Sequence, residues 1–187
     1  MRFPRLKVLI AKFRYNDAME YWELSDEELL QQCDWYAGRA SGPGGQKRNK
    51  THSAINMIHA PTKITVIANE HRMQGENRQL ALKRLRLQLA LALRRDIDLE
   101  TFVIPTEVSA QINGKGKLAV NPDNHKYLPI IAAMLDLLTV YRGQVSKAAD
   151  RLGITTTNFI NVLHDDPKLW TEAQHLRQRF QLPPLKP

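Results

Sequence analysis

The sequence contains a single cysteine, Cys33, so it cannot form a disulfide within the chain. None of its six histidines pairs with another histidine or with that cysteine at a ligand-like spacing, which argues against a structural zinc site. Apolar runs approaching the roughly 20 residues of a membrane span are missing, as are internal repeats. Hydrophobic residues nevertheless make up 43% of the 187 residues, enough for a core. We expect a soluble protein of a reducing compartment, the cytoplasm, with no metal or cofactor.

Acidic residues are scarce in one segment only. Residues 39–95 carry 12 basic and 2 acidic side chains, whereas residues 1–38 carry 5 and 7 and residues 96–187 carry 10 of each. The central segment therefore holds all of the formal excess of +8. Such a concentration favours a polyanionic partner, usually nucleic acid. A solvated basic face that aids solubility is the alternative.

The N-terminal stretch is basic and contains a short apolar run at residues 6–13. Lysines interrupt this run and no small-residue cleavage site follows it, so a secretory signal is not predicted. We expect a strand or helix packed on the body of the protein. An organelle transit peptide is the alternative, although the usual serines are missing.

A short helix, a strand and a loop are predicted next. Ser25 and Asp26 are suitable N-caps, and the acidic residues after them favour a helix that runs to about Cys33. A short strand over residues 35–40 leads into residues 41–50, where glycine and proline fill four successive positions. This composition excludes regular structure and predicts a loop.

A β-hairpin and a long helix follow the loop. Residues 53–59 alternate as a strand does, residues 61–63 form a turn, and the β-branched run 64–67 is the returning strand. Strong helix formers fill residues 77–95. We expect one leucine stripe of this helix to cover the sheet and the other to meet the C-terminal segment or a partner. The stripes are Leu82, Leu85, Leu89 and Leu93 on one face, and Leu80, Leu87 and Leu91 roughly opposite.

The C-terminal half begins irregularly and becomes helical. Residues 101–125 show no clear periodicity, and we expect a hairpin turn at residues 113–117. A helix follows from Pro129 to about Tyr141, because proline is tolerated in a first turn. Residues 182–187 are rich in proline and predict an extended tail.

Residues 145–163 resemble a helix-turn-helix core. Ala149 stands four residues before a turn glycine, Gly153, and the threonines at 155–157 offer caps for a second helix. One interpretation is a motif that docks on RNA, DNA or another protein. The other is a helical bundle packed on the second leucine stripe, which the balanced charge favours. The side chains open to a nucleic-acid contact are Thr156, Thr157, Asn158 and Asn161.

The loop at residues 41–50 carries the most informative motif. The pair Gly44-Gly45 before Gln46 indicates backbone angles closed to other residues, or a close approach to a ligand. A Walker loop is excluded because no hydroxyl residue follows Lys47, and a Rossmann loop because a hairpin follows in place of a βαβ unit.

Further motifs surround this triplet in one order. They are Arg39-Ala40-Ser41-Gly42-Pro43-Gly44-Gly45-Gln46, Asn49-Lys50-Thr51, Ser53-Ala54, His59-x-Pro61-Thr62 and Asn77-Arg78. Over residues 26–95 the sequence resembles the catalytic domain of class I peptide chain release factors and of related codon-independent ribosome rescue hydrolases. The resemblance implies an α+β fold in which a small mixed or antiparallel sheet packs on a long helix. An all-α, helix-turn-helix-like domain would follow it.

The resemblance also implies an activity and a site. The activity is hydrolysis of the ester between a nascent peptide and tRNA in the large ribosomal subunit. Gly44, Gly45 and Gln46 would be catalytic, and Gln46 would be the position that a glutamine methyltransferase modifies at N5. The residues expected to support the loop are Ser41, Gly42, Pro43, Asn49 and Thr51. Those expected to bind RNA are Arg39, Lys47, Arg48, Lys50, Arg72 and Arg78.

The sequence departs from the family in several respects. Lys47-Arg48 stands where His-Val is usual, which either fixes the loop to ribosomal RNA differently or lowers activity. No protein general base is evident, and His52 is expected to be structural or to contact RNA. Only about 25 residues precede the catalytic segment, so direct stop-codon reading is not expected. The charge-neutral C-terminal segment also differs from the basic tail of rescue hydrolases.

We therefore expect a monomeric peptidyl-tRNA hydrolase that acts on the ribosome, with P-site peptidyl-tRNA and large-subunit RNA as partners. The alternatives are a non-catalytic ribosome- or RNA-binding protein on the same scaffold, and a DNA-binding regulator. The expected divisions are an extension at 1–24, the catalytic domain at 25–100, a linker at 101–125, a helical domain at 126–180 and a tail at 181–187.

Overall fold

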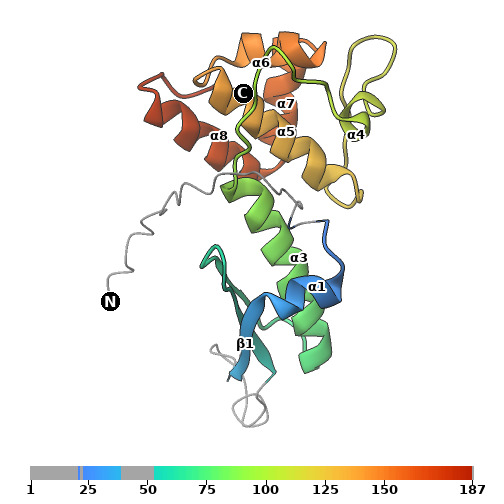
Figure 1. Cartoon of the computed structure of the whole chain (residues 1–187), viewed down its shortest axis with the longest axis vertical. Coiled ribbons are helices and arrows are strands. Elements are labelled where there is room, and N and C mark those ends of the chain that lie inside the picture. Colours follow the sequence, from blue (N-terminus) through green and yellow to red (C-terminus); the bar gives the residue numbers. More distant parts are fainter. Residues whose placement is uncertain (1–20, 22, 39–52, 187) are drawn as a thin grey trace.

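A computed structural model of the chain describes residues 21, 23–38 and 53–186. Strands β1 (Cys33–Gly38), β2 (Ala54–His59) and β3 (Thr65–Ala68) form an antiparallel sheet in the order β1-β2-β3. The long helix α3 (Gln74–Ala92) lies along this sheet, and α1 (Asp26–Gln31) packs beside it (Figure 1). The predicted α+β class, with a small antiparallel sheet on a long helix, is confirmed.

The sheet turns its apolar face toward α3. Ile55 and Met57 of β2 are fully buried, and their cross-strand neighbours Ala68 and Val66 of β3 are buried with them. Because side chains alternate along a strand, these four residues share one face. Leu85 and the other buried leucines of α3 complete this part of the core.

The bounds of the first elements differ from the predictions by a few residues. Helix α1 has the predicted Ser25 cap, whose hydroxyl accepts from the Glu28 N–H while the Glu28 carboxylate accepts from the Ser25 N–H. The helix ends at Gln31, and β1 begins at Cys33, because the Gln32 carbonyl accepts from the Ala60 N–H beside β2. Strand β1 is therefore shifted by two residues from the predicted range.

Helix α3 begins three residues before the predicted start and ends three residues before the predicted end. At its C-terminal end the Arg94 guanidinium donates to the carbonyls of Ala90, Leu91 and Leu93, which satisfies carbonyls that another helical turn would have used. The Arg95 N–H is diverted to the Asp136 carboxylate. These two contacts stop the helix inside its run of strong helix formers.

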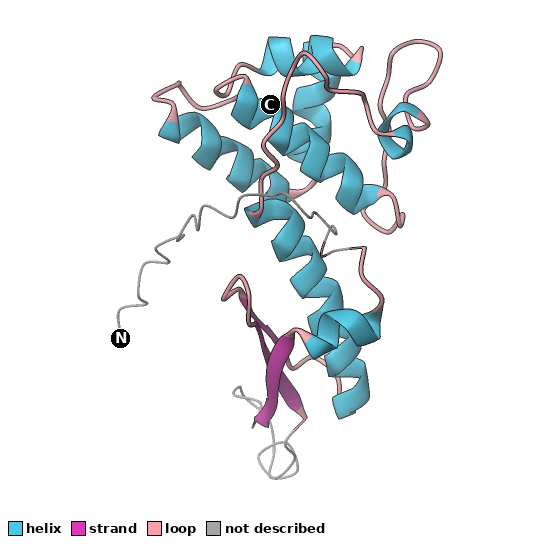
Figure 2. Cartoon of the chain, viewed as in Figure 1, coloured by secondary structure: helices cyan, strands magenta, loops and turns pink. Residues whose placement is uncertain are grey.

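The C-terminal half is helical apart from its first segment (Figure 2). Residues 101–125 hold a short helix that the sequence did not predict and the hairpin turn that it did, closed by a bridge between Ile112 and Leu118. The predicted helices near 129–141 and 145–163 are present, with small changes of bounds. The helices are α4 (Thr106–Ser109), α5 (Tyr127–Val140), α6 (Val145–Leu152), α7 (Thr156–Asp165) and α8 (Pro167–Arg179).

Helices α6 and α7 meet at a tight turn. Gly153 ends α6 with φ of 70°, and the Thr155 hydroxyl accepts from the Asn158 N–H to cap α7. Phe159 and Leu163 of α7 are fully buried. A functional helix-turn-helix domain, and the domain boundaries given above, stay predictions.

Helix α3 joins the sheet to the C-terminal helices. It packs against β2 and β3 and also against α5 and α8. The assignment of one leucine stripe to each of these contacts stays a prediction. At the joint, the buried Asp136 carboxylate of α5 accepts from the Arg95 N–H at 2.9 Å and from its Nε at 2.6 Å. Arg94 lies 3.7 Å from Glu172 of α8. These contacts fix the end of α3 on the helical part.

Helix α5 forms the centre of this helical part, because ten of its fourteen residues are buried. Residues 182–186 of the predicted tail have no regular structure, but they lie on α8, where the Gln174 side chain exchanges two hydrogen bonds with the Leu185 backbone. Among the described residues, no helix combines the length and the apolar character needed to cross a bilayer.

Candidate functional site

The predicted catalytic loop joins β1 to β2. Its residues, with most of those expected to support it or to bind RNA, lie outside the described residues: Arg39, Ser41, Gly42, Pro43, Gly44, Gly45, Gln46, Lys47, Arg48, Asn49, Lys50, Thr51 and His52. The structure describes the two ends from which the loop starts. Gly38 and Ala54 face each other as the last pair of the β1–β2 ladder.

The loop ends share one end of the sheet with the start of α3. Ala68, the last residue of β3, pairs with Ile55 beside Ala54, so residues 69–73 and the first turn of α3 lie at this end. Gly38 allows the Asn56 side chain to lie close, because a Cβ at Gly38 would be 3.1 Å from Asn56 Nδ2. We call residues 69–78, with Gly38 and Ser53, the platform.

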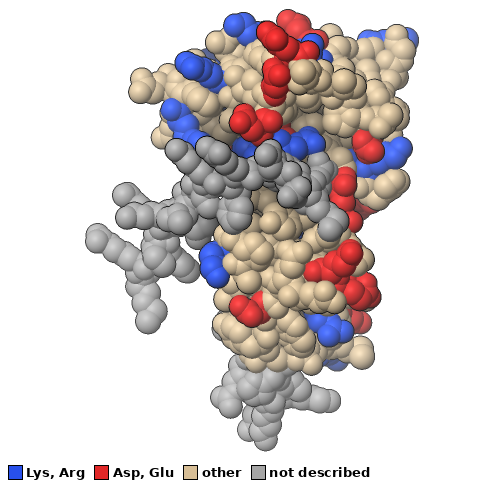
Figure 3. All heavy atoms as spheres, in the orientation of Figure 1, with Lys and Arg blue, Asp and Glu red and all other residues tan. Residues whose placement is uncertain are grey.

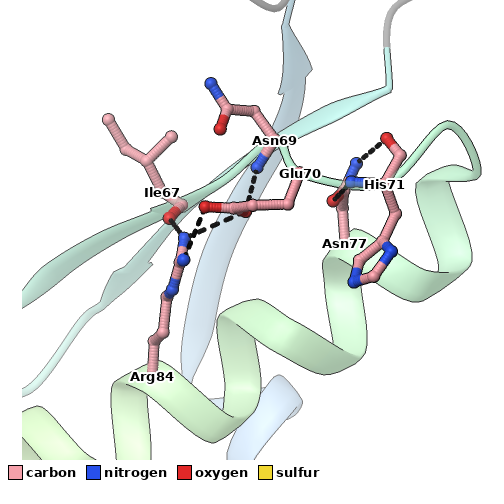
Figure 4. Close-up of polar contacts among 6 residues, drawn as sticks. All are labelled: Ile67, Asn69, Glu70, His71, Asn77 and Arg84. Carbon is pink, nitrogen blue, oxygen red and sulfur yellow. Dashed lines mark hydrogen bonds and ion pairs between the residues drawn. The ribbon is translucent and has the colours of Figure 1, made fainter.

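Asn77 links the parts of the platform. Its side chain is fully buried, and its Nδ2 donates to the Ser53 carbonyl at 2.7 Å and to the His71 carbonyl at 2.9 Å. Its Oδ1 accepts from the His71 N–H at 2.9 Å, so the amide holds both backbone groups of His71 (Figure 4). One side chain of α3 thereby ties the second loop end to the segment that follows β3.

Asn77 belongs to one of the motifs given above, but the sequence alone assigned no role to it. The signal that could have identified it is a short amide side chain in the first turns of a helix, directly after an irregular segment, where such residues hydrogen-bond to nearby backbone.

Glu70 and Arg84 brace the same segment. Arg84 reaches from α3 to the Glu70 carboxylate, at 2.6 and 3.2 Å, and to the Ile67 carbonyl (Figure 4). The hydrogen bond from Arg84, followed by that from the Asn69 N–H, lowers the pKa of Glu70 to about 2. The pair stays ionised at neutral pH, and its charges cancel.

Arg72 and Arg78 are the two predicted RNA-binding residues that the structure describes, and both are exposed in the platform. The guanidinium carbon of Arg78 lies 5.6 Å from the centre of the Trp35 ring, which is a cation–π arrangement. Trp35, Gln74, Gly75 and Arg78 line a shallow pocket there. The structure brings both arginines to the end of the sheet from which the loop starts.

The other cations of α3, and the two arginines that follow the helix, are paired with carboxylates. On the face drawn in Figure 3, basic and acidic side chains are interspersed over both halves of the molecule. The pairs, with their shortest N–O distances, are Lys83–Asp123 at 3.3 Å, Arg84–Glu70 at 2.6 Å, Arg86–Asp26 at 2.8 Å, Arg94–Glu172 at 3.7 Å and Arg95–Asp136 at 2.6 Å. The described cations along α3 and directly after it are thus largely paired with carboxylates, and Arg72 and Arg78 stand outside these pairs.

His59 and Cys33 lie at the opposite end of the β1–β2 ladder, where they pair across the strands. Burial lowers the pKa of His59 to about 4, and its ring nitrogens lie 2.8 Å from Thr62 Oγ1 and 3.2 Å from Gln32 Oε1. A neutral ring satisfies both partners. Burial, and then Asp34, raises the pKa of the Cys33 thiol to about 11, so it is not a nucleophile at neutral pH. Cys33 is half-buried.

No cluster of three or more histidine, cysteine, aspartate or glutamate side chains suited to a metal occurs in the described part of the chain. The described platform offers backbone anchors, two exposed arginines and one aromatic face. These groups suit the support of a loop and contact with phosphate groups.

Comparison with known proteins assigns the segment that forms this site. Residues 25–110 match the RF-1 domain family. Peptide chain release factor 1 of Anaplasma marginale is 49% identical over 85 residues, which cover 46% of this chain and 23% of the relative. Peptide chain release factor RF2 of Thermus thermophilus is 44% identical over 70 residues, covering 37% of this chain and 18% of the relative.

Peptide chain release factor 2 of Lactiplantibacillus plantarum is 53% identical over 51 residues, covering 27% of this chain and 14% of the relative. Residues 25–110 are therefore similar to an RF-1 domain, and this match, with the release factor relatives, supports a relationship to the class I peptide chain release factor family. The matches span about a fifth of the length of these relatives.

Proposed function

We propose that this protein hydrolyses the ester of peptidyl-tRNA on the ribosome and does so without reading a stop codon. The observation that carries the proposal is the place of Gly44-Gly45-Gln46. The triplet lies inside the matched RF-1 domain, in the segment between the paired ends of β1 and β2. The cytoplasm, a monomeric state and methylation of Gln46 belong to the same proposal.

The proposed chemistry needs a water molecule and one well-placed donor. Water attacks the ester carbonyl carbon, the bond to the tRNA 3′ oxygen breaks, and that oxygen takes a proton. The backbone N–H of Gln46 would stabilise the charge that develops on the leaving oxygen, and its side chain would position the water. One such donor contributes roughly 10²–10³ in rate. The glycines would allow the close approach to RNA that this requires.

The platform supports the proposal because it holds the two ends of the predicted catalytic loop in place. A loop that enters a narrow RNA cavity needs its ends held, and the Gly38–Ala54 pair and the Asn77 amide hold them. Arg72 and Arg78 lie where phosphate groups beside such a cavity would be met.

Codon independence is the finer part of the proposal. Residues 111–187 lie outside the RF-1 match, and their helices pack directly on the end of α3. We propose that this helical module, residues 126–180, takes part in recognising the ribosome. In this proposal the module helps to select the ribosome on which the protein acts, a task that a stop-codon-reading domain performs in decoding release factors.

The test is a release assay on ribosomes that hold peptidyl-tRNA in the P site, with an empty A site and no stop codon. Wild type should release peptide, and Gly44→Ala should lose release by roughly 100-fold or more while it still binds ribosomes. Glu107→Ala is the control, because Glu107 is an exposed residue of α4 that lies outside the loop, the platform and the helical module, and it should release as wild type does.

Each alternative has its own outcome. Release only when a stop codon occupies the A site would overturn codon independence. Ribosome binding without release would favour the non-catalytic scaffold. Sequence-specific binding of duplex DNA, with no binding to ribosomes, would favour the DNA-binding regulator.

A further inference from the structure

A hairpin outside the RF-1 match presents two lysines in a fixed geometry. Residues 112–118 are closed by the Ile112–Leu118 bridge and by the Asn113 N–H, which donates to the Lys117 carbonyl at 3.0 Å. The Asn113 side chain accepts from the N–H groups of Lys115 and Lys117, at 2.9 and 3.0 Å. The tip is therefore ordered by its own hydrogen bonds.

The hairpin is also held on α7. Asn158 is only 8% exposed, and its side chain accepts from the Leu118 N–H at 2.8 Å and donates to the Leu118 carbonyl at 3.0 Å. Gly116 has φ of 67°, and a Cβ there would lie 3.1 Å from the Gly153 carbonyl oxygen. The hairpin thus lies against the turn between α6 and α7, and only glycine fits its closest point.

This contact changes the interpretation of α7. Asn158 stood among the four side chains expected to be open to nucleic acid, but its amide is used inside the protein. The other three, Thr156, Thr157 and Asn161, are exposed. The hairpin lies against the turn that precedes these residues, at Gly153, and against Asn158, which stands between them in the sequence.

The charge of this surface is positive. Lys115 and Lys117 are exposed, and neither forms an ion pair with any residue that the structure describes. The first turn of α7 contains no carboxylate. Asp150 of α6 and Lys147 on the same helix offset each other in charge, and Asp123 is paired with Lys83 at 3.3 Å. Two cations beside exposed hydroxyl and amide groups suit phosphate oxygens.

We infer that the hairpin 112–118 and the exposed start of α7 bind the phosphate backbone of RNA, the hairpin acting as a wing beside the helix. Ribosomal RNA as the natural partner rests on the proposed function. The inferred contact itself needs only RNA. The C-terminal half has no net charge when residues 96–187 are counted together, but its surface at the hairpin is locally positive.

The experiment measures binding of the full-length protein to a short RNA duplex and to ribosomes over a range of salt concentrations. Lys115→Gln/Lys117→Gln should weaken both affinities and reduce the slope of log K against log salt by about 2, roughly one per phosphate contact. Lys115→Arg/Lys117→Arg should retain both. The control Lys168→Gln/Lys186→Gln removes the same charge from exposed positions elsewhere and should leave the slope unchanged.

A second variant tests the clamp. Asn158→Ala keeps every charge but releases the Leu118 backbone, so it should weaken RNA binding although the lysines remain. Thermal unfolding of each variant shows that the fold is retained.

The outcomes separate this inference from the proposed function. Unchanged RNA binding in the lysine variant would overturn the wing, even if the protein releases peptide. Weaker ribosome binding with an unchanged salt slope would also overturn it and would indicate a protein contact. Lysine-dependent RNA binding in a protein that releases no peptide would leave the wing in place and remove the proposed function.

Discussion

At the scale of single residues, the amide of Asn77 is the contact on which the platform depends. Asn77→Ala removes three hydrogen bonds at a fully buried position and leaves the Ser53 carbonyl and the His71 backbone without this partner. We expect a loss of about 2–3 kcal/mol in the free energy of unfolding, measured by urea denaturation. The proposed release activity should fall as well.

Asn69→Ala is the matched control for Asn77→Ala. Asn69 lies in the same segment, and only its backbone N–H takes part in the bracing contacts, donating to Glu70 at 2.8 Å. Its variant should lose less than about 0.5 kcal/mol, as surface substitutions generally do. If the two variants lose the same free energy of unfolding, the hydrogen bonds of the Asn77 amide do not stabilise the platform.

His59 predicts a dependence of stability on pH. Its folded pKa of about 4 lies below the ordinary value of 6.5, so the unfolded chain binds the proton more readily. The stability is therefore fully present above pH 6.5, and it is lost progressively as the pH falls toward 4, at up to about 1.4 kcal/mol per pH unit. His59→Gln should flatten urea-denaturation profiles over this range.

The control for His59 is the exposed His125. His125→Gln should leave the pH profile between 4 and 6.5 as it is in wild type. A wild-type profile that is flat across this range would contradict the burial of a neutral His59.

At the scale of elements, the local signals in the sequence were sufficient and the long-range ones were not. The Ser25 and Thr155 caps and the Gly153 turn act within a few residues of themselves, so their sequence context predicts them. The ends of α3 were predicted wrongly, because Arg94 and Arg95 stop the helix through partners that no pattern of helix formers reveals.

The same distinction applies to the site. The motif order identified the family and the segment that joins β1 to β2, and it placed Arg72 and Arg78 among the contact residues. It gave no role to Asn77, and the helix-turn-helix interpretation left Asn158 open to nucleic acid, since both amides bond to backbone that is distant in sequence. Buried amides of this kind can be interpreted only once the fold has placed their partners.

At the scale of the whole molecule, the joint between α3 and α5 makes one unit of the two halves. Asp136→Ala removes a buried carboxylate from Arg95, and we expect it to cost about 3 kcal/mol in the free energy of unfolding. Wild type should unfold in a single transition by urea. Asp123→Ala removes an exposed carboxylate, 3.3 Å from Lys83, and should cost less than about 1 kcal/mol.

If Asp136→Ala unfolds in two transitions while wild type unfolds in one, the contact between Asp136 and Arg95 couples the unfolding of the two halves. Two transitions in wild type would mean that the halves fold independently and that the joint does not couple them.

The uninterrupted path of α3 from the sheet to α5 and α8 restricts how this protein can change its length. Each residue inserted into an α-helix turns everything beyond it by about 100° and advances it by about 1.5 Å. A single insertion would therefore swing the wing to another side of the catalytic domain. Seven inserted residues, about two turns, would restore its direction and shift it by roughly 10 Å. Relatives with the same module should consequently vary in their loops and keep the length of this helix.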